Sequence, residues 1–383
     1  MADDCSLVQV QLMHRHGSRL PQADELVFIN DLSNHLNDPN VTSTLDSLTL
    51  PQEWTFVQGE NRWQNVLGHD SLTSIGREEC YNHGVQFRNA YPNMPFKDIV
   101  AGDVDRVVEC AKDFSEGLFG TSENSVSIVE ENNVTISSIS PWETCPLWTD
   151  AFVESGEGSV SSWDDVYLPS IAARINSLLS PVELTNDEVH GALFACAYEL
   201  AAFGNMTWCN VFNQDEIENF EYENDLLLRE GFGYGLPNNM GPVLGSLFVN
   251  NLVDRATDAT AAKTFLEFGH DTTIDLALTG LGLAKDQSYP IDGPINSTRL
   301  WRTSNQVPFA AMMVWEKWNC GRSTQIRLLM NGVPFSLAPL CPIDETTGAC
   351  ELIAFLMSPV VEQARSIDWE DHTWNSTCGN PGF

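Results

Sequence analysis

Apolar residues alternate with glutamines over residues 7–12, near the start of the chain. A period of two is typical of a β-strand, and the glycine and proline at positions 17 and 21 end it in a loop. With five further apolar runs, the predicted strands cover residues 6–13, 98–101, 125–129, 264–268, 307–315 and 325–329. Helical spacing predicts helices over residues 106–118, 240–256 and 272–283. Because strands alternate with helices, we expect an α/β fold whose sheet is covered by helices on both faces.

Residues 161–236 carry few strand signals and instead show helical spacing over residues 163–179, 185–203 and 214–228. We expect this stretch to form a smaller helical lobe inserted into the sheet domain. A chain of 383 residues fits one large domain with a lobe, or two domains. The predicted division gives residues 1–28, 95–158 and 241–383 to the α/β domain, and residues 29–94 and 159–240 to the helical lobe.

A histidine between two arginines follows the first predicted strand, in the segment Arg15-His16-Gly17-Ser18-Arg19. Arginine has a planar, permanently charged fork that suits phosphate oxygens. Two of them beside an imidazole would hold a phosphoryl group against a nucleophilic nitrogen, and Gly17 would let the backbone approach the ligand. Taken alone, such a segment is more often a solvated loop, so the interpretation needs a second half-site.

The second half-site is offered by Gly269, His270 and Asp271, which end the apolar run at residues 264–268. Transfer of a phosphoryl group to His16 needs a proton for the leaving alcohol, and an aspartic acid that its neighbours hold protonated can supply one. We therefore expect Asp271 to be held protonated, with His270 as a further phosphate contact. Asp271 could also cap the helix predicted after it, at an end that already favours phosphate.

Together the two segments resemble the histidine acid phosphatases, in the branch that includes fungal phytases and broad acid phosphatases. Residues 15–21, RHGSRLP, fill the RHGxRxP signature of that family, and His270-Asp271 fills its later HD signature. The two lie in the family's order, about 250 residues apart, and the resemblance covers nearly the whole chain. It implies a phosphoglycerate-mutase-like fold, with a mixed sheet flanked by helices and an inserted helical lobe.

A third element is similar to the DxDRVxxSA segment of the family and spans residues 101–111, AGDVDRVVECA. The resemblance implies that Arg106 is another phosphate-binding arginine; without it, Arg106 would be read as a surface residue at the start of a helix. The chain departs from the family pattern in having alanine and glycine at positions 101–102, where serines are common. It also has Cys110 where serine or threonine is common.

The resemblance implies a role for each matched residue. His16 attacks phosphorus and becomes a phosphohistidine, and Asp271 protonates the departing oxygen before helping to activate water. The side chains expected to hold the phosphoryl oxygens are Arg15, Arg19, Arg106 and His270.

No metal and no other cofactor is expected, because arginines take over the charge neutralisation that magnesium performs in kinases. His14 and His16 could share one face of a strand and bind a metal ion. However, no third ligand occurs at a suitable spacing, and Arg15 between them would repel a cation.

The charge balance is strongly acidic, with 53 Asp and Glu against 19 Lys and Arg and a net charge of −34. Such a surface repels anions at neutral pH, which argues against nucleic acid and anionic membranes as partners. The repulsion would also act on a phosphate ester. Because carboxylates protonate near a pKa of about 4, we expect an acidic activity optimum.

Ten cysteines without a C-x-x-C pair favour disulfides over zinc. Ten cysteines together with five N-glycosylation sequons indicate a secreted protein. Because the chain starts MADDC without an apolar leader, we expect that a signal peptide has been removed, and no run approaches the ~20 apolar residues of a membrane span. Sequons for N-glycosylation occur at Asn40, Asn133, Asn205, Asn296 and Asn375.

Cysteine connectivity does not follow from the sequence alone. Short loops make Cys196–Cys209 and Cys341–Cys350 plausible pairs. The resemblance to the fungal enzymes implies Cys5–Cys320 and Cys145–Cys378, which leaves Cys80 with Cys110.

The expected substrate is a small phosphate ester. A dedicated phytase would benefit from extra cations for the six phosphates of phytate, yet none of the five lysines adjoins the signature segments. This favours a broad acid phosphomonoesterase with some phytase capacity, with a dedicated phytase as the alternative. A silent secreted glycoprotein of the same fold is a second alternative, which the intact His16 and Asp271 count against. A mutase using the same nucleophile is disfavoured by the Arg-x-Pro ending at residues 19–21. Some fungal relatives are homo-oligomers, so oligomeric state stays open.

Overall fold

A computed structural model describes residues 4–121, 125–321, 323–367 and 372–379 of the chain. One mixed sheet forms its centre, in the order β3-β2-β4-β1-β5-β6-β7, with β8 paired to β6. The first four of these strands run parallel to one another, and β5, β6 and β7 complete the sheet with antiparallel pairs. The strands are β1 (Cys5–Arg15), β2 (Ile99–Gly102), β3 (Val126–Val129), β4 (Thr264–Gly269), β5 (Met312–Cys320), β6 (Ser323–Met330), β7 (Val333–Phe335) and β8 (Cys350–Glu351).

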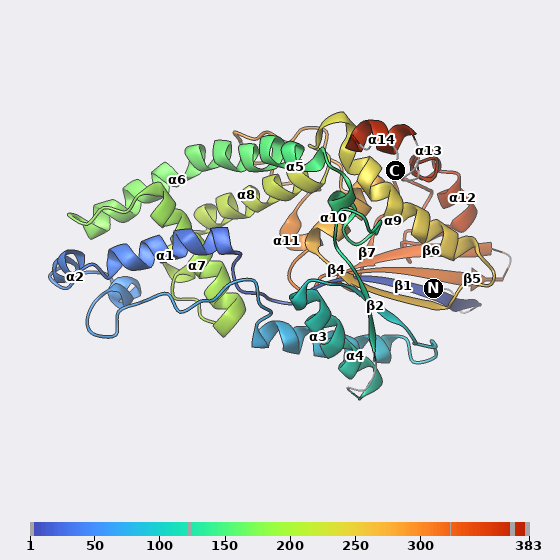
Figure 1. Ribbon diagram of the computed structural model, residues 1–383, viewed down its shortest axis with the longest axis horizontal. Coiled ribbons are helices and arrows are strands. Elements are labelled where there is room, and N and C mark those ends of the chain that lie inside the picture. Colours follow the sequence, from blue (N-terminus) through green and yellow to red (C-terminus); the bar gives the residue numbers. More distant parts are fainter. Residues whose placement is uncertain (1–3, 122–124, 322, 368–371, 380–383) are drawn as a thin grey trace.

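Helices cover both faces of the sheet, as the sequence predicted, and others extend beyond one end of it (Figure 1). The longer helices are α1 (Ala23–Leu36), α3 (Ser74–Ala90), α4 (Asp105–Phe119), α6 (Gly158–Leu179), α7 (Asn186–Phe203), α8 (Gln214–Phe232), α9 (Met240–Thr257) and α10 (Asp271–Gly280). The shorter ones are α2 (Pro39–Leu45), α5 (Trp148–Ala151), α11 (Thr303–Gln306), α12 (Leu352–Leu356), α13 (Pro359–Arg365) and α14 (His372–Cys378). Short helical turns are η1 (Gln52–Val57), η2 (Pro141–Thr144), η3 (Phe152–Glu157), η4 (Cys209–Val211) and η5 (Pro237–Asn239). Within the described part of the chain, no helix has the length and apolar character needed to cross a bilayer.

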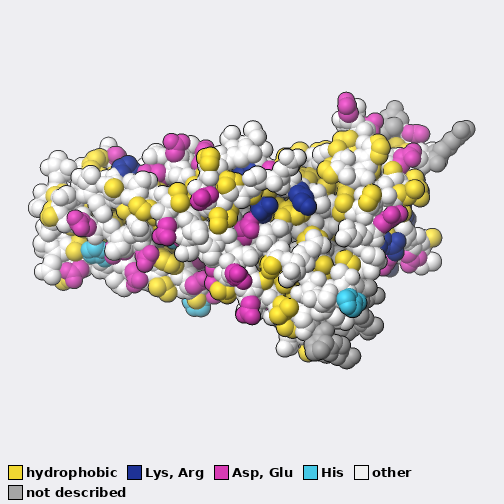
Figure 2. Space-filling model, turned by 90° about the horizontal axis from the view of Figure 1, so that it is seen from above, with side chains coloured by type: hydrophobic (Ala, Val, Ile, Leu, Met, Phe, Trp, Pro, Cys, Tyr) yellow, Lys and Arg dark blue, Asp and Glu magenta, His cyan; other side chains and the backbone are white. Residues whose placement is uncertain are grey.

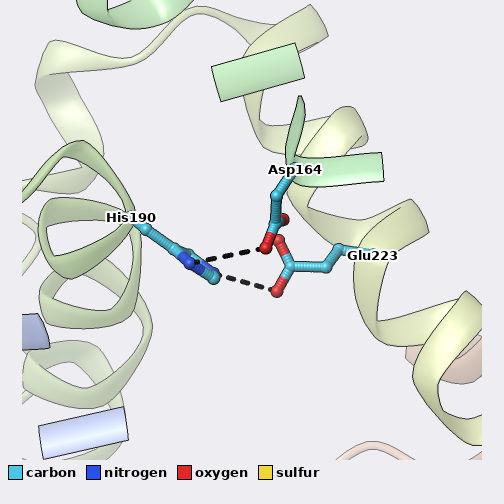
Figure 3. A group of neighbouring side chains, drawn as sticks. All are labelled: Asp164, His190 and Glu223. Carbon is cyan, nitrogen blue, oxygen red and sulfur yellow. Dashed lines mark hydrogen bonds and ion pairs between the residues drawn. The ribbon is translucent and has the colours of Figure 1, made fainter. Parts of the chain in front are cut away.

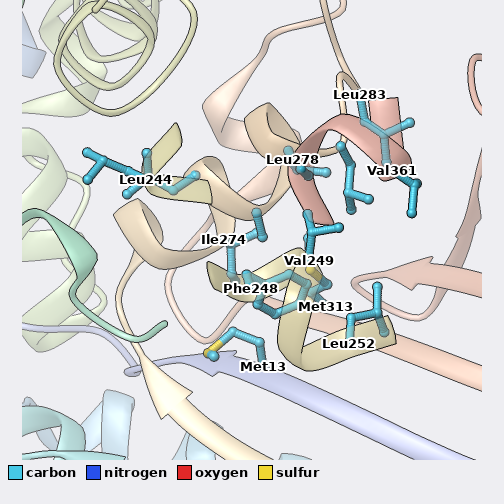
Figure 4. Close-up of a cluster of buried hydrophobic side chains, with 14 of the residues drawn as sticks. Met13, Leu244, Phe248, Val249, Leu252, Ile274, Leu278, Leu283, Met313 and Val361 are labelled. Atoms are coloured by element: carbon cyan, nitrogen blue, oxygen red, sulfur yellow. The ribbon is translucent and has the colours of Figure 1, made fainter. Parts of the chain in front are cut away.

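Successive residues of the central strands enter different hydrophobic cores, because side chains alternate between the faces of a sheet. Met13 of β1 packs with α9 and α10 in one core, where Figure 4 shows it near Phe248 and Ile274. Leu12 belongs to a second core, on the face covered by α3 and α4. The alternation that predicted β1 from the sequence is therefore the pattern that joins the sheet to both helical layers.

The helical lobe has a core of its own, built from α1, α6, α7 and the first part of α8. Trp208 is completely buried in it and meets the rings of Trp54, Phe56 and Trp63 edge-on. In Figure 1 these helices extend to the left of the sheet.

The division drawn from the sequence placed α3 in the helical lobe, but its side chains pack elsewhere. Phe87 of α3 and the following Tyr91 lie in the core beneath the sheet, and the Cys80–Cys110 disulfide joins α3 to α4. Helical spacing shows that a helix has an apolar face but does not show which core this face joins. We propose that residues 74–91 belong to the α/β domain, and that the lobe is built on α1, α2, α6, α7 and the start of α8.

The strand predicted at residues 307–315 begins later, at Met312. Pro308 lacks a backbone donor, and Ala310 has a φ of 59°, a left-handed conformation that interrupts a strand. Residues 307–311 instead form a loop whose Ala311 carbonyl accepts a hydrogen bond from the Arg15 amide at 2.9 Å. This loop brings the Phe309 ring to the two arginines of the signature segment.

All five disulfides join the pairs expected from the sequence, and no cysteine is free. Cys110, which departs from the family pattern, is the partner of Cys80. A serine at that position could not tie α3 to α4.

Candidate active site

Two parallel neighbouring strands, β1 and β4, bring the two predicted half-sites together. Arg15 is in register with Gly269, and the His16 amide donates to the Gly269 carbonyl at 3.1 Å. Strand β2 lies parallel on the other side of β4 and leads into α4, whose second residue is Arg106. The carboxyl ends of parallel strands form the edge where α/β proteins bind ligands, and all six predicted residues lie at or beyond such ends.

The His16 side chain is buried at 2 % exposure, with its reactive nitrogen facing the other predicted groups. Its Nδ1 lies 2.8 Å from the Gly17 carbonyl oxygen, which can only accept, so this nitrogen carries the proton. Arg106 Nε donates to the opposite nitrogen, Nε2, at 3.2 Å. Burial, followed by the charges of Arg15 and Arg106, holds the pKa of His16 well below its ordinary value. His16 is therefore neutral, with its Nε2 lone pair directed into the site.

Arg15 pairs with the predicted proton donor, its Nη2 lying 2.8 Å from Asp271 Oδ2. The guanidinium also donates to the Val307 carbonyl and lies over the Phe309 ring, 4.5 Å from its centre. The side chain is thus fixed on three sides before any ligand binds.

Arg19 reaches the helical lobe instead. Its Nη1 donates to Glu25 Oε2 and to the Tyr198 hydroxyl, at 3.2 Å each, and that hydroxyl donates to Glu25 Oε1 at 2.7 Å. Because Glu25 lies on α1 and Tyr198 on α7, the lobe positions one of the phosphate-binding candidates. The site therefore lies where the lobe meets the sheet.

Arg106 is the cation of the group without a neutralising partner. Across the described residues, no carboxylate comes within 4.0 Å of its guanidinium, and its Nε donates to His16. Burial, followed by the charge of Arg19, lowers its pKa, which is the effect expected where cations crowd in a partly dry space. An anion placed between Arg106 and Arg19 would relieve this repulsion.

His270 brings with it a carboxylate that the sequence did not reveal. Its Nε2 lies 2.9 Å from Glu131 Oε2, and both side chains are less than a tenth exposed. The Glu131 carboxylate also approaches one of the positions that depart from the family pattern. A Cβ at Gly102 would lie 1.9 Å from Glu131 Oε1, so a serine there would require this carboxylate to move.

Asp271 is ionised in this arrangement, which corrects the expectation that its neighbours hold it protonated. Burial alone would raise its pKa, but Arg15, Arg19 and His270 outweigh burial and hold the pKa below its ordinary value. Its side chain is 22 % exposed, compared with 10 % for the side chain of Arg15. Protonation of Asp271 therefore depends on drawing Arg15 away from it.

A second aspartate, Asp275, follows Asp271 by one helical turn on α10 and is completely buried. Neither of its carboxyl oxygens has a hydrogen-bond partner among the described residues. Burial, followed by the negative charge of Asp271, raises its pKa well above the ordinary value, so it is neutral where Asp271 is charged.

The start of α3 holds the signature loop. A Cβ at Gly17 would lie 2.3 Å from the Gly76 carbonyl oxygen, so this close backbone contact requires a glycine at position 17. Ser18 adds two hydrogen bonds to Glu79, from its amide at 2.8 Å and from its hydroxyl at 3.0 Å. Two points of contact on α3 thus fix the backbone around His16.

His14, considered as a metal ligand beside His16, belongs to the core. Its ring stacks on Phe268, 4.9 Å between centres, and burial followed by the nearby His83 lowers its pKa to about 3. Its Nδ1 is paired with the backbone carbonyl of Arg15, and its Nε2 lies 3.1 Å from His83 Nδ1, so both ring nitrogens are already engaged.

Sequence reasoning missed Glu131, Phe309 and the Glu25–Tyr198 pair. Glu131 had one usable signal, since it follows the end of a predicted strand at residues 125–129. Phe309 was hidden inside a wrongly extended strand. Glu25 and Tyr198 are 173 positions apart and carry no local motif.

Comparison with known proteins agrees with this geometry. The profile of the family described as histidine phosphatase superfamily (branch 2) matches residues 6–331. The thiamine-repressible acid phosphatase pho4 of Schizosaccharomyces pombe is 30% identical over 94% of this chain and 82% of its own length. Phytase PHO112 of Candida albicans is 25% identical over 85% of this chain and 72% of its own length. Among solved structures, the phytase from D. castellii superposes with a TM-score of 0.84 at 21% identity, covering 100% of this chain and 84% of that one.

Proposed function

Because this chain belongs to the histidine phosphatase superfamily, branch 2, and is a histidine acid phosphatase, we propose that it hydrolyses phosphate monoesters through a phosphohistidine on His16, with Asp271 as proton donor. The observation that carries the proposal is the state of His16. Its Nδ1 is fixed on the Gly17 carbonyl, which leaves the Nε2 lone pair facing Arg106 at 3.2 Å. A neutral imidazole so oriented is a nucleophile without a separate base.

In the first step, Nε2 forms a bond to phosphorus as the ester P–O bond breaks. The charge on the phosphoryl oxygens is shared by Arg15, Arg19, Arg106 and His270. A bound phosphate competes with Asp271 for Arg15, so the pKa of Asp271 rises towards its ordinary value and the carboxyl can give its proton to the leaving oxygen. In the second step, Asp271 takes a proton from water, which attacks phosphorus and releases phosphate from His16.

The same coupling supports an acidic optimum. Asp271 must be protonated when the ester binds, and acid favours this. The protein carries a net charge of −34, and acidic side chains are spread over the face seen in Figure 2, where Lys and Arg are few. Protonation of surface carboxylates at low pH lowers the repulsion of an anionic ester. A rate that rises steadily from about pH 5 to pH 8 would contradict the proposed acid role.

The substrate we propose is a range of simple phosphomonoesters, with some capacity for phytate. Lys97 lies two residues before β2, Lys263 directly precedes β4, and Lys317 pairs with Gln9 towards the start of β1. Three of the five lysines therefore lie towards the end of the sheet opposite to His16. A site for a sixfold phosphorylated inositol gains nothing from these cations, which favours broad specificity over a dedicated phytase. Hydrolysis rates measured on phytate and on an aryl phosphate at the optimum pH distinguish broad specificity from a dedicated phytase.

We also propose that the protein is secreted. All ten cysteines are in disulfides, which persist in oxidising compartments. Of the five sequon asparagines, three are exposed, and Asn205 and Asn375 are half-buried.

Trapping the covalent intermediate tests the mechanism. Rapid quenching with a ³²P-labelled ester is expected to yield a phosphoenzyme that is stable to base and labile to acid. His16→Ala should abolish both the label and turnover, whereas His69→Ala, at an exposed histidine, should change neither. A folded His16→Ala enzyme with normal turnover would refute the proposal.

A further inference from the structure

A second group of ionisable side chains converges in the helical lobe, on three helices that carry none of the signature residues. Figure 3 shows Asp164 of α6, His190 of α7 and Glu223 of α8 pointing toward one another. His190 Nε2 lies 2.9 Å from Glu223 Oε1, and its Nδ1 lies 4.0 Å from Asp164 Oδ2. The side chains of His190 and Glu223 are 6 % and 8 % exposed. A histidine and two carboxylates are thus held together in a largely dry space.

The donor atoms have nearly the spacing that one metal ion needs. Each of the three residues offers one donor atom, and these atoms lie within 4.8 Å of one another. Zinc binds histidine nitrogen and carboxylate oxygen at about 2.0–2.2 Å in a tetrahedron, so its ligand atoms are separated by roughly 3.3 Å. A modest side-chain rotation closes the difference, because His190 and Glu223 already approach to 2.9 Å.

One carboxylate oxygen of the group lacks a hydrogen-bond partner among the described residues. This oxygen is Asp164 Oδ1, which is buried. Within the same residues, no lysine or arginine comes within 4.0 Å of either carboxylate, whose ion-pair partner is His190. A buried carboxylate oxygen without a donor is costly, and a cation would remove this cost.

The surrounding side chains fix the donors in place. The Tyr167 hydroxyl donates to Glu223 Oε2, the oxygen that does not face His190. The His190 ring stacks on Phe194 at 4.3 Å between centres and meets Phe28 at 5.2 Å. Metal sites depend on such contacts to orient their ligands, so the group is arranged before an ion arrives.

An entry path adjoins the group. A cavity of about 180 Å³ is lined by Asp164 and His190 together with Asp165 and Asp187. The two further aspartates add negative charge at its wall, which raises the local concentration of cations.

We propose that Asp164, His190 and Glu223 form a binding site for one divalent zinc-like cation, with water as a fourth ligand. The single imidazole nitrogen favours zinc or cobalt over calcium, which takes six to eight oxygen ligands. The site is independent of the proposed phosphatase mechanism, whose ligand contacts come from arginines and His270.

Calorimetric titration of the full-length, EDTA-treated and dialysed protein at pH 7 with ZnCl₂ tests the site. The wild type is expected to bind one equivalent, and Asp164→Asn and Glu223→Gln are each expected to weaken binding by at least about tenfold. Asp187→Asn removes the same charge from the cavity wall without removing a ligand, and should weaken binding far less. In the wild type, CoCl₂ should give the intense visible absorption of tetrahedral cobalt, and CaCl₂ should give no binding.

Melting curves without metal show whether each variant is folded, and added zinc should raise the melting temperature of the wild type but not of Asp164→Asn. Phosphatase activity without added metal should be the same in all four proteins. Absence of a one-to-one zinc complex overturns the proposal, and so does a complex that both ligand variants retain. If the wild type binds no zinc and Asp164→Asn melts at a higher temperature, the group is a carboxylate pair sharing a proton only.

Discussion

The buried carboxyl of Asp275 should lower the free energy of unfolding as pH rises above about 4. A variant without this carboxyl should not show that loss. The ordinary pKa of Asp275 is 3.8, and burial followed by the charge of Asp271 raises the pKa well above that value in the folded protein. Below pH 3.8 both folded and unfolded chains hold the proton. Above it the unfolded chain ionises while the folded chain does not, so ionisation favours unfolding.

The magnitude follows from the ordinary pKa alone while the folded carboxyl stays neutral. Each pH unit well above 3.8 then costs on the order of 1 kcal/mol, so the cost accumulated between pH 4 and pH 6 is roughly 2 kcal/mol. Asp275→Asn preserves the shape of the side chain and cannot ionise. Any constant cost of the buried amide cancels when the same pair of proteins is compared at two pH values.

Urea unfolding with the disulfides intact, followed by tryptophan fluorescence at pH 4, 5 and 6, measures the difference. The stability of Asp275→Asn relative to wild type should rise by roughly 2 kcal/mol across this range. Asp31→Asn, at an exposed position of α1, makes the same charge change at the surface and should show a much smaller change. A stability difference between Asp275→Asn and wild type that is the same at pH 4 and pH 6 would refute the reasoning.

Three further results are expected. Asp271→Asn should lower kcat on an alkyl phosphate by about 10²–10⁴-fold but far less on p-nitrophenyl phosphate, whose leaving group needs no proton; equal losses on both would contradict a role as proton donor. Glu131→Gln should raise KM for the ester by about tenfold in steady-state kinetics, because the His270 ring loses the carboxylate at 2.9 Å that orients it. An unchanged KM would show that this contact does not affect ester binding. In protein secreted from a eukaryotic cell, peptide mass spectrometry should find glycans at the exposed Asn40, Asn133 and Asn296 but not at Asn205, whose Nδ2 donates to Glu199 at 2.7 Å; full occupancy at Asn205 would count against this structure of the loop.

The predicted site residues come together because each lies at or beyond the carboxyl end of a parallel strand, and strand ends can be predicted from local patterns. His16 and His270 could be predicted because each follows an apolar run that ends in reactive or charged residues. The charge state of Asp271 could not be predicted in this way. It depends on a 2.8 Å contact with Arg15, which no local pattern contains.

Packing partners were the least predictable part of the fold. Residues 74–90 were only assigned to the helical lobe as part of a larger region, and the disulfide and the core shared with α4 show that α3 supports the sheet. The loop at residues 307–311 misled for a local reason, since its apolar composition is that of a strand while Pro308 and Ala310 prevent one. The sequence therefore did not predict that Phe309 lies in the site.

The pairing of β1 with β4 has a consequence for how the protein is made. Val10 must find Thr264 as its neighbour before His16 and Asp271 can face each other. Contacts between residues so distant in sequence form slowly, because a long loop must close first. During synthesis the nucleophile leaves the ribosome long before its proton donor exists. A chain cut anywhere before β4 therefore holds His16 in an incomplete sheet, and such fragments should have no partial activity.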